Sequence, residues 1–340
     1  METKRLSTSN EDIKTAGEIL RLGGLVGIPT ETVYGLAANA LDSTAVEKIF
    51  VAKGRPQDNP LIVHISEISE VSPLVASFPQ EARRLAERFW PGPLTIILPK
   101  SDIIPNVVSA GLNSVAIRLP ESEAARRIIK AAGSPLAAPS ANLSGSPSPT
   151  SYAHVLNDLD GKIDAVVEGE DSRVGVESTV ISFVCNPPRI LRPGGITPEM
   201  IREILPETEI DEAVLEELKN DTPVASPGMK YKHYSPKARI ILVESDKDNF
   251  VKFIKKQREK DKNIFALVFL EDAPFLEKPY LTYGSENDDL SQAEQIFNVL
   301  RRLDEEGCNI CYAHAPKKSG VGLAVYNRLI RAAAFEVIKL

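Results

Sequence analysis

The sequence predicts an α/β protein of two domains, and three observations support this prediction. Segments with the apolar spacing of helices alternate along the chain with short apolar runs typical of buried strands. The chain has 340 residues, more than the roughly 250–300 at which a single core stops growing. Hydrophobic residues make up 43% and charged residues 26% of it, as in an ordinary folded protein. These proportions exclude bulk disorder, a collagen-like chain and a disulfide-stapled miniature.

Helix and strand patterns alternate through the first two hundred residues. Residues 11–21 have the spacing of an amphipathic helix with Asn10 as its N-cap, and Gly23-Gly24 ends it. Further helices are predicted at 43–52 and 80–89. Strands are predicted at 25–28, 61–65, 95–98, 115–119, 136–138, 165–168, 179–184 and 189–191.

The character of the chain changes after residue 200. Residues 201–221 are strongly acidic and are predicted to form a solvated surface segment. The next segment, up to residue 238, contains three prolines and a glycine, so it cannot be a continuous helix or a central strand. Strands at 239–243, 263–269 and 310–312 then alternate with helices at 246–257, 291–306 and 321–338. We therefore predict a larger domain at 1–206, a linker at 207–238 and a smaller α/β domain at 239–340.

The sequence also limits where the protein acts. The first residues contain no apolar segment, so we expect no secretory signal. The longest apolar run, around residues 264–270, is far shorter than the roughly 20 residues of a membrane helix. The three cysteines, Cys185, Cys308 and Cys311, are few and odd in number, which favours a reducing cytosol and a cytoplasmic protein. Cys308 and Cys311 form a lone CxxC that we interpret as packed thiols, with a redox or metal role as the alternative.

The usual nucleotide and hydrolase motifs are missing from the sequence. It has no GxxxxGK[ST] loop, no GxGxxG after a strand, no HExxH and no GxSxG. Any nucleotide must therefore bind in another way. The sequence PTETVYGL (29–36) follows a predicted strand, at the carboxyl end where α/β sheets place ligands. Its hydroxyls suit a small polar ligand, although a plain turn with local hydroxyl capping explains them equally well.

Two cationic positions stand out in the first domain. Lys53 and Arg55 flank a glycine at the end of a predicted helix, and the sequence KGRPQDNPLIVH (53–64) continues into a strand. Simple capping of the helix explains both charges, but two cations beside one glycine in a proline-stiffened loop also suit a phosphate. Arg118 interrupts an apolar strand, so it needs a carboxylate or phosphate partner, either a ligand or an internal glutamate.

Hydroxyl-rich segments follow later strands. The sequence APSANLSGSPS (138–148) suits phosphate or ribose contacts. No His or Asp marks Ser140 as a nucleophile, and we do not interpret it as one. The short sequences EST (177–179) and RPG (192–194) lie at the edges of predicted strands.

Together these segments identify a family resemblance. The blocks PTETVYGL, AKGRPQDNPLIVH, VAIRLP, APSANLSG, ESTVI and LRPG, in this order, closely resemble the YrdC-like threonylcarbamoyl-AMP synthases over roughly the first 200 residues. The sequence PGMKYKHYSP (227–236) and the α/β tail resemble the long, two-domain form of these enzymes. The resemblance implies a twisted-sheet YrdC-like domain with a central basic cavity and a smaller Rossmann-like C-terminal domain.

The resemblance also implies an activity. Such enzymes make L-threonylcarbamoyladenylate and pyrophosphate from L-threonine, bicarbonate or CO₂, and ATP, with Mg²⁺ accompanying the nucleotide. A downstream threonylcarbamoyl transferase complex then uses the product to form t6A at adenosine 37 of ANN-decoding tRNAs, and on the same grounds we expect a weak tRNA or RNA contact. Separately from the resemblance, we expect the linker to close over the nucleotide as a lid, because it carries aromatic and basic side chains at residues 229–234 where a passive linker would be plain.

Residue roles carry over by position. The catalytic residues implied are Lys53 and Arg55, placed beside the phosphates. The threonine-binding residues implied are Thr32, His64, Arg118, Ala138 through its backbone, and Ser178. The ATP-binding residues implied are Arg55, Asn59, Ser114, Ser140, Asn142, Ser148, Arg192 and the linker residue Tyr234. No protein metal ligands are implied.

Two other interpretations remain. An RNA-binding module of the same fold, without adenylate synthesis, would fit the concave basic face of such domains, but the net charge of −7 and the lack of a Lys/Arg cluster disfavour it. Hydrogenase-maturation carbamoyltransferases share the core, but they carry zinc-finger cysteines and a further module for which this chain has no room.

Overall fold

The computed structural model describes residues 2–217 and 234–340, and it divides the chain into two compact units. Among the described residues, the first unit comprises 2–144 and 148–214, and the second comprises Gly145–Pro147, Leu215–Glu217 and residues 234–340. Half of the predicted linker at 207–238, residues 218–233, lies outside the described residues, and with it the body of the predicted lid. No helix among the described residues has the length and apolar character to cross a bilayer.

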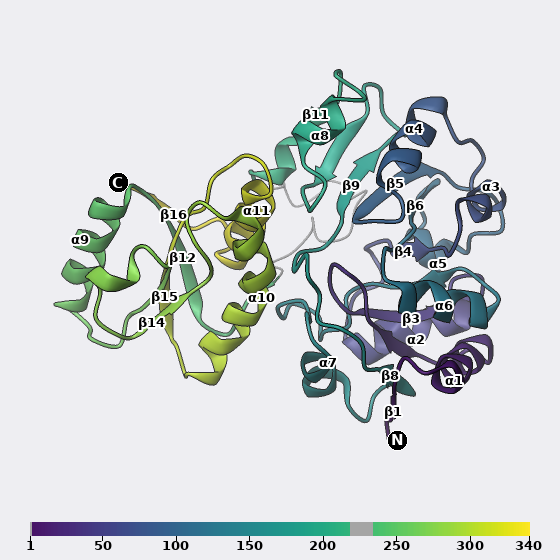
Figure 1. Ribbon diagram of the computed structural model, residues 1–340, viewed down its shortest axis with the longest axis horizontal. Helices are drawn as coiled ribbons and strands as arrows, with labels where there is room; N and C mark the ends of the chain where they lie inside the picture. Colours follow the sequence, from purple (N-terminus) through teal and green to yellow (C-terminus); the bar gives the residue numbers. More distant parts are fainter. Residues whose placement is uncertain (1, 218–233) are drawn as a thin grey trace. The chain divides into compact units, whose positions relative to one another are not determined.

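The first unit is built on one large mixed sheet (Figure 1). Its strand order is β1-β8-β2-β3-β7-β4-β6-β5-β9-β10-β11. The strands are β1 (Lys4–Leu6), β2 (Val26–Ile28), β3 (Gly35–Asn39), β4 (Ile62–His64), β5 (Leu94–Pro99), β6 (Ser114–Arg118), β7 (Leu136–Ala137), β8 (Ala165–Val167), β9 (Thr179–Ser182), β10 (Arg189–Arg192) and β11 (Glu209–Ile210). The helices are α1 (Asn10–Arg21), α2 (Ser43–Lys53), α3 (Val71–Leu74), α4 (Gln80–Phe89), α5 (Asn106–Ser109), α6 (Glu123–Ala132), α7 (Tyr152–Leu159) and α8 (Pro198–Arg202).

Helices cover both faces of this sheet. Helices α1 and α6 contribute to one apolar cluster, together with β2 and β8. Helices α2, α4 and α7 contribute to a second, larger cluster. Helices α1 and α6 approach very closely at Gly17, where an added Cβ would lie 2.5 Å from the Ala131 Cβ. This contact explains why a helix interior keeps a residue with poor helix propensity.

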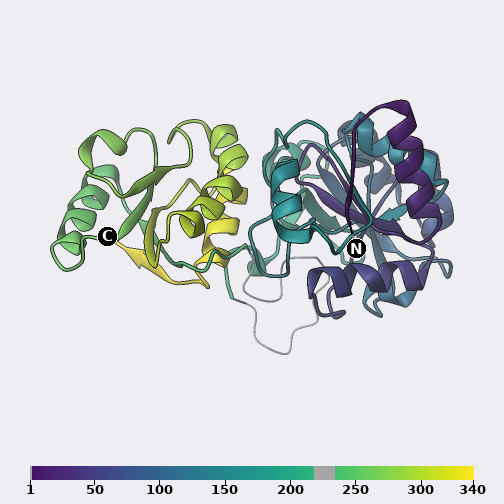
Figure 2. The ribbon, with the colours of Figure 1, turned by 90° about the horizontal axis from the view of Figure 1, so that it is seen from below.

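The second unit is a Rossmann-like layer of five parallel strands in the order β14-β13-β15-β12-β16. Helix α9 covers one face of the sheet, and α10 and α11 cover the other (Figures 1 and 2). Its strands are β12 (Arg239–Glu244), β13 (Phe265–Val268), β14 (Tyr280–Thr282), β15 (Ile310–His314) and β16 (Val337–Lys339). Its helices are α9 (Lys247–Arg258), α10 (Asp289–Glu305) and α11 (Gly322–Ala332).

A buried histidine joins the carboxyl ends of these strands. His314 ends β15, and its Nδ1 lies 2.8 Å from the Asp272 carboxylate while its Nε2 lies 3.0 Å from the Ser245 carbonyl oxygen. The ring stacks on Phe250 at 4.3 Å between centroids. Cys308 and Cys311 are buried free thiols, and the described residues contain no group of three or more His, Cys, Asp or Glu suited to a metal.

Three sequence predictions are wrong in detail. The N-cap of α1 is Ser9 rather than Asn10, because its side chain accepts the Asp12 N–H. The helix predicted at 321–338 ends at Ala332, and two residues with positive φ then lead into β16, which pairs with β12. Residues 201–221 are not a wholly solvated segment, because Ile201, Leu205 and Val214 are buried in the first unit.

Candidate functional site

Two neighbouring strands bring the central residues of the site together. His64 ends β4 and Arg118 ends β6, and their Cα atoms are register partners in this parallel pair. Both side chains are almost completely buried, with 3% and 4% of their surface exposed. β7 pairs with the other side of β4, and the Ala138 N–H just beyond it donates to the Ile62 carbonyl at 3.0 Å. Predicted threonine-binding residues from three segments of the chain therefore lie at one region of the sheet.

The loop between β2 and β3 meets this region through its hydroxyls. Arg118 Nη1 donates to Thr32 Oγ1 at 2.8 Å. Thr30 Oγ1 donates to the Val33 carbonyl at 2.6 Å, and its distance to Thr32 Oγ1 is 2.9 Å. Because the single Thr30 proton is committed to Val33, Thr32 must donate to Thr30. A lone pair of Thr32 therefore remains to accept a hydrogen bond from a ligand.

Glu31 supplies a counter-charge that the sequence analysis left unassigned. Its Oε1 accepts from Arg118 Nη2 at 2.7 Å, and both side chains are buried. Burial alone would raise the pKa of Glu31, but the Arg118 charge and the hydrogen bonds lower it below its ordinary value. The internal glutamate that the sequence offered as one possible partner of Arg118 is thus present as Glu31.

His64 is neutral in this environment. Burial, with the nearby Arg118 charge, lowers the pKa of His64 to about 3. Its Nδ1 lies 3.2 Å from the Ile62 carbonyl oxygen, which can only accept, so we assign the ring proton to Nδ1. The Nε2 lone pair is then available as an acceptor.

Ser178 and Arg192 form a second cluster. Arg192 Nε donates to the Ser178 carbonyl at 3.0 Å, and Nη2 donates to Ser178 Oγ at 3.2 Å. Thr95 Oγ1, on β5, lies 2.7 Å from the same hydroxyl. Gly194 makes this close approach possible, because an added Cβ would lie 2.4 Å from the Thr179 nitrogen.

The loop that carries Ser140 and Asn142 is held by Lys53. The buried Lys53 ammonium donates to the Ser140 carbonyl and to the Asn142 carbonyl at 2.5 Å. Ser140 Oγ donates to Asn142 Oδ1 at 2.6 Å. Lys53 lies at the end of α2, where Gly54 forms a left-handed C-cap and turns the chain toward Arg55. The structure thus brings Lys53, Ser140 and Asn142 together.

The other residues of the first unit that are predicted to bind the nucleotide lie on several separate segments of the chain. Arg55 Nη2 donates to the Asn59 carbonyl at 3.1 Å. Ser148 is buried and donates to the Glu177 carboxylate. Ser114 begins β6, at the opposite end of that strand from Arg118.

Tyr234 belongs to the second unit. It has a positive φ of 63°, its ring lies 5.3 Å from that of Phe297, and the Arg328 guanidinium lies 5.6 Å from its centroid.

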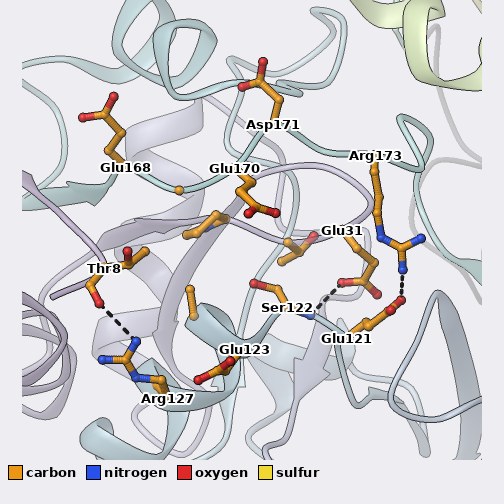
Figure 3. Close-up of a pocket in the computed structure, with 14 residues that line it drawn as sticks. Thr8, Glu31, Glu121, Ser122, Glu123, Arg127, Glu168, Glu170, Asp171 and Arg173 are labelled. Atoms are coloured by element: carbon orange, nitrogen blue, oxygen red, sulfur yellow. Dashed lines mark hydrogen bonds and ion pairs between the residues drawn. The ribbon is translucent and has the colours of Figure 1, made fainter. Parts of the chain in front are cut away.

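A pocket of about 710 Å³ lies beside this site (Figure 3). It is lined by Glu31 and by further acidic side chains from the loop after β8 and the start of α6, including Glu168, Glu170 and Glu123. Its lining includes none of the residues predicted to bind threonine or ATP. It is therefore not the basic cavity that the resemblance implies, and it meets the candidate site at Glu31.

Sequence reasoning missed three buried polar residues of the site. Glu31, Thr95 and Glu177 contact Arg118, Ser178 and Ser148 respectively. Glu31 lies in PTETVYGL and Glu177 in EST, two segments that resemble the family, so their positions in the sequence could have indicated them. Thr95 lies in an apolar strand, and nothing in its local sequence distinguishes it.

Comparison with known protein families assigns both parts of the chain. Residues 18–194 match the Sua5/YciO/YrdC family model, described as "Telomere recombination". Residues 196–334 match the model described as "Threonylcarbamoyl-AMP synthase, C-terminal domain".

Full-length relatives agree with this assignment. Threonylcarbamoyl-AMP synthases of Pyrococcus abyssi and Bacillus subtilis are 44% and 43% identical to this chain, covering 96% and 99% of it and 96% and 97% of their own lengths. A crystal structure of P. abyssi Sua5 complexed with L-threonine is similar to the whole chain, with a TM-score of 0.92, 40% identity and 100% coverage of both.

Proposed function

The chain belongs to the threonylcarbamoyl-AMP synthase family, in its two-domain form, and from this premise we propose the reaction it catalyses. L-threonine, bicarbonate or CO₂, and ATP are converted into L-threonylcarbamoyladenylate and pyrophosphate. The product serves a threonylcarbamoyl transferase complex that forms t6A at adenosine 37 of ANN-decoding tRNAs. The observation that carries the proposal is the buried Arg118, which is held beside His64 and Thr32 in a region where a small amino acid could bind.

The threonine side follows from the donors and acceptors present. Arg118 binds the threonine carboxylate, because two of its five N–H groups, one on each terminal nitrogen, have no partner among the described residues. Thr32 Oγ1 and His64 Nε2 accept hydrogen bonds from the hydroxyl or amino group of threonine. The Ala138 backbone and Ser178 complete this side.

The nucleotide side combines positive charge with hydroxyls. The reaction needs a carbamate oxygen to attack the α-phosphorus of ATP, with the bond to pyrophosphate breaking. Negative charge then increases on the phosphate oxygens, and Lys53 and Arg55 stabilise it. Lys53 does so while fixing the loop of Ser140 and Asn142. Asn59, Ser114, Ser148 and Arg192 contact the rest of the nucleotide.

Mg²⁺ fits this site as an ion that ATP carries. Since no group of three or more His, Cys, Asp or Glu among the described residues is placed to hold a metal ion, the phosphates and water would supply most of its ligands. When bound, it supplies further positive charge at the phosphate oxygens.

The test is pyrophosphate release from ATP, with L-threonine and bicarbonate omitted in turn. We expect release that requires both. Release without threonine would indicate other adenylation chemistry. No release under any condition, together with salt-sensitive RNA binding, would support the binding-module alternative.

A further inference from the structure

Glu31 is a buried carboxylate held from two sides. Its Oε1 accepts from Arg118 Nη2 at 2.7 Å, and Oε2 lies 3.4 Å from the Ser122 N–H (Figure 3). Ser122 is the N-cap of α6, so the carboxylate lies near the positive end of that helix. The position of Glu31 is thus determined by its own backbone segment, by a helix terminus and by Arg118.

Arg118 is in turn held by three acceptors. They are Glu31 on Nη2, Thr32 on Nη1 and, at 3.4 Å, the Gly92 carbonyl on Nε. An arginine side chain has several rotatable bonds, and a guanidinium binds a carboxylate bidentately only in one orientation of its plane. Of the three acceptors, Glu31 accepts the shortest hydrogen bond, at 2.7 Å, and its carboxylate is itself fixed from a second side by the Ser122 N–H.

From this geometry we propose that Glu31 is a positioning residue for threonine. Its carboxylate holds the guanidinium plane of Arg118 so that one N–H of each terminal nitrogen is presented to the threonine carboxylate. The inference rests on the proposed function, since it takes Arg118 as the threonine ligand. It assigns to Glu31 no contact with threonine and no chemical step.

The proposal requires that residue 31 keeps an acceptor oxygen at this position. It does not require that oxygen to carry a negative charge. Glutamine keeps an oxygen at the same distance from the backbone and loses the charge. Aspartate keeps the charge but withdraws the oxygen by one methylene. The two substitutions therefore separate position from charge, and the unfolding midpoint of each variant is measured beside its kinetics, because both alter a buried ion pair.

The experiment measures pyrophosphate release with Glu31→Gln and Glu31→Asp, at varied threonine and at varied ATP. We expect Glu31→Asp to raise the KM for threonine about tenfold or more, as for a displaced hydrogen bond to a charged group. Its KM for ATP should stay within about twofold. Glu31→Gln should keep the threonine KM within about threefold of the wild-type value.

The matched control is Glu121→Gln in the same pocket. Glu121 pairs with Arg173 through an exposed ion pair and lies near Glu31 (Figure 3). Removing its charge should leave both KM values unchanged, because exposed ion pairs contribute little.

Three results would overturn the proposal. In the first, Glu31→Gln raises the KM for threonine more than Glu31→Asp does, which would show that the negative charge controls threonine binding. In the second, both variants keep the wild-type KM for threonine. In the third, the unfolding midpoint falls while that KM is unchanged, which indicates a purely structural ion pair. Failure of the proposed function is separate, since it would show as pyrophosphate release by the wild-type protein that does not depend on threonine.

Discussion

The neutral state of His64 makes the stability of the protein depend on pH. Because the pKa of His64 in the folded protein is about 3, against 6.5 when exposed, the unfolded chain binds a proton below pH 6.5 that the folded chain does not. The free energy of unfolding therefore falls as the pH is lowered from 6.5 toward 3. The slope from this residue is about 1.4 kcal/mol per pH unit.

We expect His64→Gln to reduce this dependence. Between pH 6.5 and 5 the wild-type protein should lose about 2 kcal/mol through this group, and the variant should not. Glu31 does not contribute in this interval, because its lowered pKa places its loss of stabilisation below its ordinary value of 4.5. Denaturant unfolding at each pH measures the difference, and equal slopes in both proteins would show that His64 is protonated when folded.

Lys53 and Arg55 are expected to determine turnover. Replacing either with Ala should lower kcat by roughly a hundredfold or more, as for the loss of one preorganised electrostatic contact. The control is Lys48→Ala on the same helix, because its ammonium donates at 2.7 Å to the Gly23 carbonyl, away from the site. Near wild-type turnover in the Lys53 or Arg55 variant would exclude the catalytic role of that residue.

At the scale of elements, the approach of the segment after β10 to the start of β9 depends on Gly194. A Cβ there would lie 2.4 Å from the Thr179 nitrogen and 2.6 Å from the Glu177 carbonyl oxygen. Backbone atoms cannot give way as side chains do, so Gly194→Ala must separate the two segments. The hydrogen bonds between Arg192 and Ser178 would lengthen.

We expect Gly194→Ala to reduce kcat/KM about a hundredfold, the order of loss for a displacement of about 1 Å in a site. Gly195→Ala is the matched control. There the nearest atoms are side-chain carbons of Val174 and Pro93 at 3.1 and 3.2 Å, which can move. Equal activity of the two variants would show that the close approach is not needed.

For the molecule as a whole, the local spacing of apolar residues predicted a helix or strand well where burial of one face determines that element. Helix α4 has the bounds that its spacing predicts. The helix predicted at 321–338 is too long, and the reason is physical. Residues 321–338 have helical spacing, but Ala334 and Phe335 adopt positive φ and the segment beyond pairs with β12, almost a hundred residues earlier.

The site shows the same limit. The sequence predicted that Arg118 needs an anionic partner, but it could not identify Glu31, which lies 87 residues away in the chain. The contact between Thr95 and Ser178 spans 83 residues. Such pairings depend on the strand order of the sheet, which no local pattern contains. The residue roles themselves came from the family resemblance, and they stay predictions until the variants are measured.

The contact between Arg192 and Ser178 has a thermodynamic consequence. Arg192 is assigned to the nucleotide and Ser178 to threonine, and the two residues are hydrogen-bonded to each other. Binding of either ligand would therefore fix the residue that contacts the other ligand. The two affinities should then be linked, and linkage is reciprocal: the factor by which ATP tightens threonine equals the factor by which threonine tightens ATP.

Calorimetric titration with a non-hydrolysable ATP analogue would measure this factor, which we expect to be about fivefold or more. Ser178→Ala should bring it close to one. Independent binding in the wild-type protein would contradict the linkage. If it holds, each substrate raises the affinity of the enzyme for the other, and the cell's supply of one sets how efficiently the enzyme uses the other.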